Sequence, residues 1–253
     1  MAVPAPFTNH LLDGLSCKDR NKLLNAGETV QLHFGEVLCE PRQAFGYAFF
    51  PLTGFISLLS TLHDRQPLEL GLIGNEGMLG ATLALGLDAA PLRAVVHGPG
   101  TALRLRVSEL RRQFLSSPSL LKMLHRYQYV LMAQLSTSAA CAHFHAVEVR
   151  LATFLLMAHD RAQSDHFKLT HESLSGMLGA RRSGVTVAAG VLQRKLLIRY
   201  TRGEISILDR AGLEDACCEC YSATIHVYAQ LLGGAAARPT AKLPESIRTL
   251  PYR

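Results

Sequence analysis

The chain has 253 residues, of which 48% are hydrophobic and 18% are charged. This length allows two domains, or one large one, with a substantial core, and the composition excludes a disordered chain, a fibrous repeat and a small disulfide scaffold. No apolar run approaches the roughly 18 to 20 residues that cross a bilayer, and the N-terminal segment lacks the pattern of a signal peptide. We therefore expect a cytoplasmic protein that does not enter a membrane.

The formal net charge of +6 is concentrated in one part of the chain. Residues 165–210 hold eight basic and four acidic side chains, whereas residues 28–117 hold seven basic and eight acidic ones. The C-terminal part thus predicts a polyanionic partner, and the N-terminal part does not.

A short helix is predicted over residues 16–26. Ser16 is a suitable N-cap, Asp19 lies in the first turn near the positive end of the helix dipole, and Gly27 offers a left-handed exit. We assign residues 1–27 to an N-terminal helical segment.

Residues 28–107 contain short apolar runs separated by Gly, Pro, Asn and Asp, a pattern typical of β-strands. The runs are residues 30–34, 47–50, 55–62, 68–73, 93–96 and 101–107. In the last run apolar residues alternate with Arg104 and Arg106, as in a strand with one solvent-exposed face. We expect an antiparallel barrel or sandwich over residues 28–117.

A long helix is predicted over residues 118–146, starting at Pro118, because apolar or small side chains recur alternately three and four residues apart. We expect this seam to pair with the same helix of a second subunit in a homodimer, and the alternative is a helix that lies on its own barrel. The predicted dimer seam consists of Leu121, Leu124, Gln128, Leu131, Leu135 and Ser138.

A C-terminal domain is predicted over residues 147–222, and it opens with a helix over residues 147–159. Thr170 caps a second helix, Gly179 ends it in a tight turn, and a third helix begins near Arg181. Strands at 196–200 and 204–208 flank a hairpin with Arg202 at its tip. Residues 223–253 are assigned to the end of a last helix and a mobile tail.

Two helices joined by a glycine turn, followed by a basic hairpin, predict a winged helix-turn-helix. In this motif the second helix enters the major groove, where arginine pairs with guanine and hydroxyls contact bases or phosphates, and the wing contacts the DNA backbone. The predicted DNA-contacting residues are Thr170, Arg181, Arg182, Ser183, Thr186 and Arg202.

Four stretches of the sequence resemble bacterial transcription regulators of the cyclic-AMP receptor protein and fumarate-nitrate regulator (CRP/FNR) superfamily. They are Gly54-Phe55, residues 73–80 (IGNEGMLG), residues 149–152 (VRLA) and residues 169–198. The resemblance implies an α+β fold with an N-terminal cyclic-nucleotide-binding-type β-barrel (a jelly roll), a dimerisation helix and a C-terminal winged helix-turn-helix. It also implies binding of double-stranded DNA at a palindromic promoter site and contact with RNA polymerase.

The sequence departs from the cyclic-AMP-binding members at the positions of the effector pocket. Those members use a Gly-Glu step for the ribose, an Arg-Ser pair for the cyclic phosphate and a Thr-Ser pair for the base. Losing the charged hydrogen bonds to the phosphate would cost roughly 1.5 to 3 kcal/mol, so we expect no tight cyclic-AMP binding by that mode, and the effector is unknown. The positions here are Gly80, Ala81, Leu92, Arg93, Leu135 and Ser136.

Two further features of the family are missing. The N-terminal half holds only Cys17 and Cys39, so the cysteine cluster of the iron–sulfur sensors is absent. Relatives place a Glu after the Arg that corresponds to Arg182, and a second Arg four residues beyond that Glu, where this chain has Ser183 and Val187. We expect a half-site that differs from the familiar one, with Arg182 and Arg181 contacting guanine.

The six cysteines are too few and too unevenly spaced for a disulfide framework, and we expect reduced thiols. Cys141 and His145 share a helix face and could ligate a metal or haem, but we expect them to be packed side chains. Cys217 and Cys220 have redox-motif spacing within a helix predicted over residues 210–232, and small buried thiols are the expectation over a thiol switch. No cofactor or metal is predicted.

The sequence thus predicts a homodimeric, sequence-specific transcription regulator with a degenerate effector barrel. An enzyme or metalloprotein is disfavoured, because residues 28–107 show no metal-ligating cluster and no nucleophile motif. The main alternative is a ligand-binding signalling module whose C-terminal domain contacts protein rather than DNA.

Overall fold

The computed structural model describes residues 8–61 and 67–233, which divide into two compact units. Of these residues, 8–58, 72–129 and 161–163 form the N-terminal unit, and the others form the C-terminal unit. The five segments assigned from the sequence stay a prediction, and most of the predicted mobile tail lies outside the described residues. Within the described residues, no helix has both the length and the apolar character that a membrane span requires.

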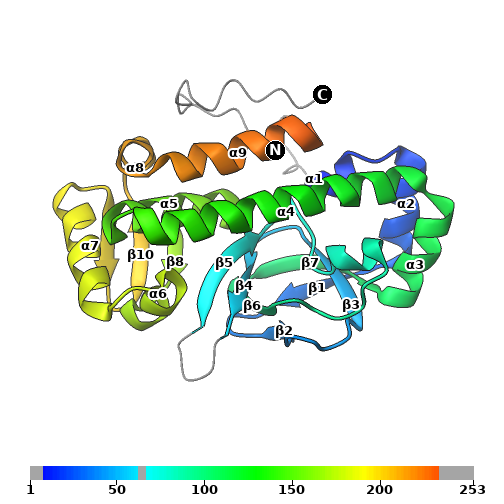
Figure 1. The fold of residues 1–253 in the computed structure, drawn as a ribbon, viewed down its shortest axis with the longest axis horizontal. Coiled ribbons are helices and arrows are strands. Elements are labelled where there is room, and N and C mark those ends of the chain that lie inside the picture. The colour runs from blue at the N-terminus through cyan, green and yellow to red at the C-terminus, as the bar shows by residue number, and fades with distance from the viewer. Residues whose placement is uncertain (1–7, 62–66, 234–253) are drawn as a thin grey trace, which may run out of the picture. The chain divides into compact units, whose positions relative to one another are not determined.

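Strands β1–β7 form two sheets, with strand orders β1-β7-β3 and β2-β6-β4-β5 (Figure 1). Strand β2 was not predicted, and the other six lie where the apolar runs placed them. The bounds are β1 (Glu28–Leu32), β2 (Val37–Cys39), β3 (Tyr47–Pro51), β4 (Phe55–Ser60), β5 (Leu68–Ile73), β6 (Arg93–Gly98) and β7 (Gly100–Arg106).

The predicted alternation in β7 is confirmed. Leu103 and Leu105 are buried, whereas the guanidinium of Arg104 donates to the Glu28 carboxylate at 2.7 Å. Glu28 and Arg104 are opposite each other in the antiparallel β1·β7 pair, so the ion pair spans the outer face of this sheet.

Four short helices accompany these sheets. Ser16 caps the second of them as predicted, because its side chain accepts from the Asp19 amide. Gly27 is extended, with φ −102° and ψ 171°, so the predicted left-handed exit is wrong. Val107 begins a helix rather than ending β7. The bounds are α1 (His10–Asp13), α2 (Cys17–Ala26), η1 (Ala81–Leu85) and α3 (Val107–Ser116).

The glycines of the IGNEGMLG stretch serve close packing. A Cβ on Gly77 would overlap the hydroxyl of Tyr127, which is almost fully buried. A Cβ on Gly74 would overlap the side chain of Arg161, whose Nε donates to Glu76 at 2.8 Å. Glycine at these two positions therefore lets the side chains of Tyr127 and Arg161 approach the backbone closely.

The long helix α4 (Pro118–Phe144) confirms the predicted helix to within two residues of its end. Its residues up to Tyr129 belong to the N-terminal unit and the rest to the C-terminal unit. It is followed by α5 (Val147–Ala162), three residues longer than predicted.

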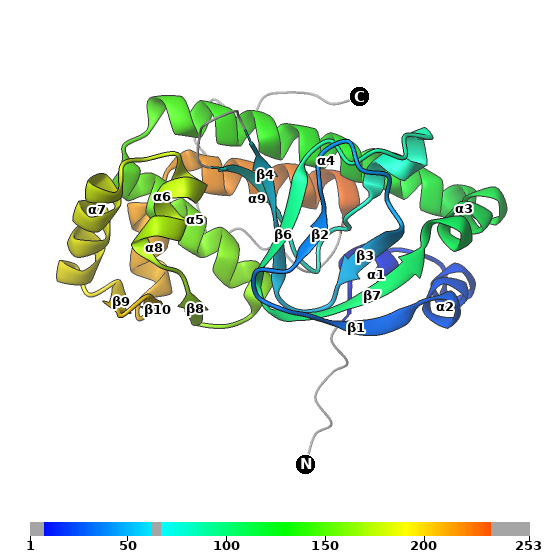
Figure 2. The same cartoon turned by 90° about the horizontal axis from the view of Figure 1, so that it is seen from below.

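The C-terminal unit continues with a three-stranded sheet of order β8-β10-β9 and four helices (Figure 2). Strand β8 was not predicted. The single helix predicted over residues 210–232 is wrong, because the chain breaks at Cys217 and Cys218 into α8 and α9. The bounds are β8 (His166–Lys168), α6 (His171–Leu178), α7 (Arg182–Arg194), β9 (Ile198–Thr201), β10 (Glu204–Ile207), α8 (Arg210–Ala216) and α9 (Glu219–Leu232).

Candidate nucleic-acid interface

Helices α6 and α7 form a helix-turn-helix, as the sequence predicted. The Thr170 side chain caps α6 by accepting from the Ser173 amide at 3.1 Å. Gly179 ends α6 in the left-handed region, with φ 55° and ψ 38°. The two helices pack through buried apolar side chains, and their other faces remain available to a partner. The buried set is Leu174, Met177, Leu178, Val185, Ala188, Ala189 and Leu192.

The first turn of α7 presents an exposed basic surface. Arg181 is the N-cap residue with extended backbone, and Arg182, Ser183 and Thr186 follow on the exposed side. Within the described residues neither Arg181 nor Arg182 forms an ion pair with a carboxylate. Both guanidiniums are thus available to bind an anion.

Thr186 differs from the other predicted contacts because its hydroxyl is already bonded within the protein. Thr186 Oγ1 donates to the Arg182 carbonyl at 3.0 Å and lies 3.1 Å from Nδ1 of His171. Burial, followed by the charge of Arg182, lowers the pKa of His171, and its ring packs against that of Tyr200 with centroids 4.4 Å apart. His171 therefore supports α7 as a neutral side chain, a role that sequence reasoning missed.

Strands β9 and β10 form the predicted wing, with Arg202 and Gly203 at the turn. These residues have φ 51° and 83°, the left-handed pair of a two-residue hairpin turn. The Leu169 amide donates to the Gly203 carbonyl at 2.8 Å, and the Tyr200 hydroxyl donates to the Leu169 carbonyl at 3.0 Å. The wing is thus bonded to the residue before the Thr170 cap, and the Arg202 side chain is exposed.

Strand β9 begins at Ile198, two residues later than predicted. Leu196 has φ 58°, which is incompatible with an extended strand, and Leu196 and Leu197 make the turn from α7 into the wing.

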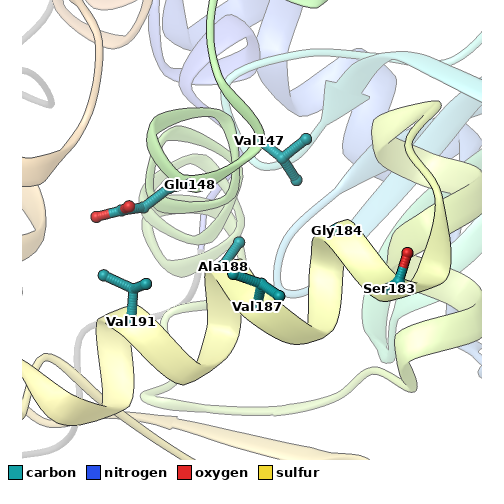
Figure 3. A pocket seen from close by; sticks show the side chains of 7 residues that line it. All are labelled: Val147, Glu148, Ser183, Gly184, Val187, Ala188 and Val191. Atoms are coloured by element: carbon teal, nitrogen blue, oxygen red, sulfur yellow. The ribbon is translucent and has the colours of Figure 1, made fainter.

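A hollow of about 360 Å³ separates the start of α5 from the middle of α7 (Figure 3). Val187, which occupies the place of a base-contacting Arg in relatives, lines this hollow and is 65% exposed. Glu148 lies on the α5 side, and its carboxylate accepts from Lys195 at 2.8 Å. This ion pair, which was not predicted from the sequence, compensates the negative charge of Glu148 at the edge of the hollow.

The predicted effector residues divide between the two units. Gly80 has φ 96° and precedes η1, and Ala81 is buried. The Leu92 carbonyl accepts from the Cys39 thiol, and the Arg93 Nε lies 3.2 Å from the Glu40 carboxylate. Ser136 belongs to the C-terminal unit, is exposed and donates to the Met132 carbonyl. The positive charge of Arg93 is therefore compensated by a carboxylate of the same chain.

The predicted seam of α4 is only partly exposed. Leu124 is fully buried within the N-terminal unit, and Gln128 donates to the Ala81 carbonyl. These two residues contact their own unit, as in the alternative weighed from the sequence, and the dimer seam as a whole stays a prediction. The half-buried members are Leu121, Gln128, Leu131, Leu135 and Ser138.

The exposed stripe of α4 is displaced by one residue toward the C-terminus from the predicted dimer seam. Its members recur at the same three- and four-residue spacing, and Met132 and Phe144 are its large apolar side chains. We call it the α4 stripe, and it consists of His125, Tyr129, Met132, Ser136, Ala139, Ala140 and His143, with Phe144 at the end of the helix.

Comparison with known proteins supports the assignment of a helix-turn-helix domain. Residues 149–216 match the family model of the Crp-like helix-turn-helix domain. The chain is 26% identical over 196 residues to the transcriptional regulator SdrP of Thermus thermophilus. The match covers 74% of this chain and 93% of SdrP.

Two solved structures show the same fold. FixK2 from Bradyrhizobium japonicum matches with a TM-score of 0.62 at 15% identity, covering 76% of this chain and 98% of FixK2. The c-di-GMP-responsive global regulator CLP of Xanthomonas campestris matches with a TM-score of 0.59 at 15% identity, covering 76% of this chain and 99% of CLP. The matched helix-turn-helix domain and these relatives support membership of the CRP/FNR superfamily, and the chain is similar to its transcription regulators.

Proposed function

We propose that the protein binds a palindromic promoter site as a homodimer and recognises sequence through the first turns of α7. The observation that carries this proposal is the exposed start of α7, where Arg181 and Arg182 make no ion pair with a carboxylate in the described residues. Arg202 is exposed on the wing of the same unit. A recognition helix and a wing that both offer free guanidiniums suit a major groove flanked by phosphates.

The side chains on this surface favour a particular kind of half-site. Arg182 suits bidentate pairing with O6 and N7 of guanine, and Ser183 offers a hydroxyl to a base edge or phosphate. Val187 is apolar and exposed, so it suits the methyl group of thymine where relatives use an arginine. We therefore propose that the half-site contains a guanine contacted by Arg182. At the base pair that faces Val187, no arginine contact selects the base.

The α4 stripe is the proposed dimer contact. It combines exposed Met132 and Phe144 with small residues at Ala139 and Ala140, which allow two helices to approach closely. A twofold axis along such a contact presents α7 twice, and the DNA site is then a palindrome. Contact with RNA polymerase in the cytoplasm follows from this role.

The barrel is proposed not to take cyclic AMP by the familiar mode. Ala81 replaces the ribose carboxylate, Leu92 replaces the phosphate guanidinium, and Arg93 already faces Glu40. Any phosphate bound near Arg93 would compete with that ion pair, which lowers its affinity further. The effector is unidentified, and the response of CLP to c-di-GMP is a property of that protein.

The test selects bound sequences from a random duplex library with the full chain and then measures affinity by fluorescence anisotropy. Arg182→Ala is expected to weaken binding to the selected site by about 5- to 150-fold and to relax selectivity at the guanine position. Arg20→Ala removes a partly exposed arginine on α2 that pairs with Asp13; it is the control and should bind like the unaltered chain.

If the library yields no selected sequence, or if Arg182→Ala and Arg20→Ala lose DNA affinity equally, the assignment of α7 as the recognition helix would be contradicted. Capture of a protein partner without any retention of DNA would instead support the signalling module.

A further inference from the structure

Four side chains of the C-terminal unit with metal-ligating atoms meet at one point. They are Cys141, His145, Cys218 and Cys220, and their ligand atoms all lie within 4.8 Å of one another. The sulfurs of Cys141 and Cys218 are 3.5 Å apart, and the sulfur of Cys220 is 3.6 Å from Nδ1 of His145. The four ligand atoms thus lie close enough together to bind one ion.

The break between α8 and α9 creates this arrangement. Cys141 and His145 lie one turn apart at the end of α4, where the His145 amide donates to the Cys141 carbonyl at 3.1 Å. Cys218 is the N-cap residue of α9, and Cys220 lies in its first turn. Cys217 is not part of the group, because its thiol donates to the Glu214 carbonyl at 3.1 Å.

The two closest ligand separations match the edges of a coordination tetrahedron. Zinc bonds of about 2.3 Å to sulfur and about 2.0 to 2.1 Å to nitrogen give a sulfur–sulfur edge of about 3.8 Å and a sulfur–nitrogen edge of about 3.6 Å. The two measured separations lie within about 0.3 Å of these values. A disulfide would need about 2.05 Å between the sulfurs, so the thiols are free.

The surroundings also suit a metal site. All three cysteines are buried, and Val149 packs against them. Nε2 of His145 lies 3.3 Å from the Glu219 carboxylate, which favours the tautomer that leaves Nδ1 free to face the sulfurs. The hydroxyl of Thr153 lies 3.1 Å from the Cys218 sulfur and can donate to a thiolate. These contacts orient the ligands in the way that outer-shell partners do.

We propose that Cys141, His145, Cys218 and Cys220 hold one Zn²⁺ ion in a closed structural site that fastens the end of α4 to the start of α9. Three sulfurs and one imidazole are the ligand set of structural zinc sites, and four protein ligands leave no open position for catalysis. An iron–sulfur cluster distributes its ligands over several irons and needs them further apart. Binding converts the three thiols to thiolates and releases their protons to solvent.

This proposal does not depend on DNA binding, and it revises the expectation of packed thiols without a metal. The test purifies the full chain under reducing conditions, reconstitutes it with ZnSO₄ and measures metal by mass spectrometry. We expect one zinc ion per chain, lost on treatment with a chelator together with a lower unfolding temperature. Replacement by Co²⁺ should give the visible bands of a tetrahedral ion and a thiolate charge-transfer band.

Cys218→Ser should lower the affinity for Zn²⁺ by more than about tenfold, and His145→Gln should do the same. The matched control is Cys217→Ser, the adjacent thiol outside the group, which should keep one zinc ion per chain. The Co²⁺ spectrum of the unaltered chain gives an answer even where a variant fails to fold. Failure of the reduced chain to take up Zn²⁺ or Co²⁺, or equal loss of metal in Cys217→Ser, would overturn the proposal.

Discussion

Oγ1 of Thr186 lies 3.1 Å from Nδ1 of His171 and donates to the Arg182 carbonyl at 3.0 Å. A hydroxyl has one proton, so Nδ1 of His171 must be the donor in the first contact. The lowered pKa of His171 keeps this ring neutral at pH 7, with its other nitrogen unprotonated. Thr186 was predicted from the sequence to contact DNA, but its hydroxyl instead forms hydrogen bonds that hold α6 and α7 together.

Thr186→Val should consequently change DNA binding little. Loss of one neutral hydrogen bond predicts a decrease in affinity of less than about fivefold, far smaller than for Arg182→Ala. Anisotropy titrations of both variants on the same selected duplex give the comparison. A decrease as large as that of Arg182→Ala would show that the hydroxyl turns toward the DNA on binding.

Arg202→Ala should weaken binding uniformly across DNA sequences. The wing guanidinium is exposed at a hairpin turn and suits a phosphate rather than a base edge. Removing one phosphate contact should reduce the slope of log K against log salt by about 0.9 per subunit, without changing the preferred sequence. Titrations of selected and scrambled duplexes between low and high salt measure both quantities, and a change in base preference would contradict the assignment to the backbone.

The winged helix-turn-helix was predictable because local residues specify it. Thr170 caps α6, Gly179 supplies the left-handed turn, and Arg202 with Gly203 forms the hairpin turn. Strand β8 was missed because it is only three residues long and has no neighbouring strand signal. Its place in the sheet depends on pairing with β10, which is a tertiary effect.

The thiol site was beyond sequence reasoning for a different reason. Cys141 and Cys218 are 77 residues apart, and only the break between α8 and α9 turns Cys218 and Cys220 toward α4.

The α4 seam shows a related limit of sequence-based prediction. A repeat of 3.5 residues marks a contact face, but it does not say whether Leu124 meets its own unit or a partner, and here it meets its own unit.

Gly179 and Gly190 should respond to alanine with opposite signs. Gly179 has φ 55°, and an added Cβ would lie 2.7 Å from Cδ1 of Leu68, so Gly179→Ala should lower the free energy of unfolding by about 1 to 2 kcal/mol. Gly190 lies within α7, and its Cβ would meet only the Arg194 guanidinium at 3.5 Å. Gly190→Ala should therefore stabilise the protein by up to about 1 kcal/mol. Urea unfolding of the two variants tests both expectations. Destabilisation by Gly190→Ala would mean that packing of α7 requires the space that glycine leaves at this position.

Stability of the N-terminal unit should fall in mild acid because of His97. Burial, followed by the charge of Arg93, lowers the pKa of His97 to about 4, and its Nδ1 lies 2.8 Å from the Ser57 hydroxyl. Between pH 6.5 and 4 the unfolded chain binds a proton at this residue and the folded chain does not, so stability is lost as the pH falls through this window.

The expected loss between pH 7 and pH 5 is about 2 kcal/mol, and His97→Gln should abolish this part of the pH dependence. His159 provides a contrast of opposite sign. The neighbouring carboxylate of Asp160 is the main cause that raises its pKa, so His159 stabilises its own C-terminal unit more at low pH, and His159→Gln should make that unit less stable at pH 5 relative to pH 7. Urea unfolding at pH 5 and pH 7, with an NMR titration of the His97 ring, measures both. An imidazole that titrates near 6.5 in the folded chain would rule out this origin of the acid sensitivity.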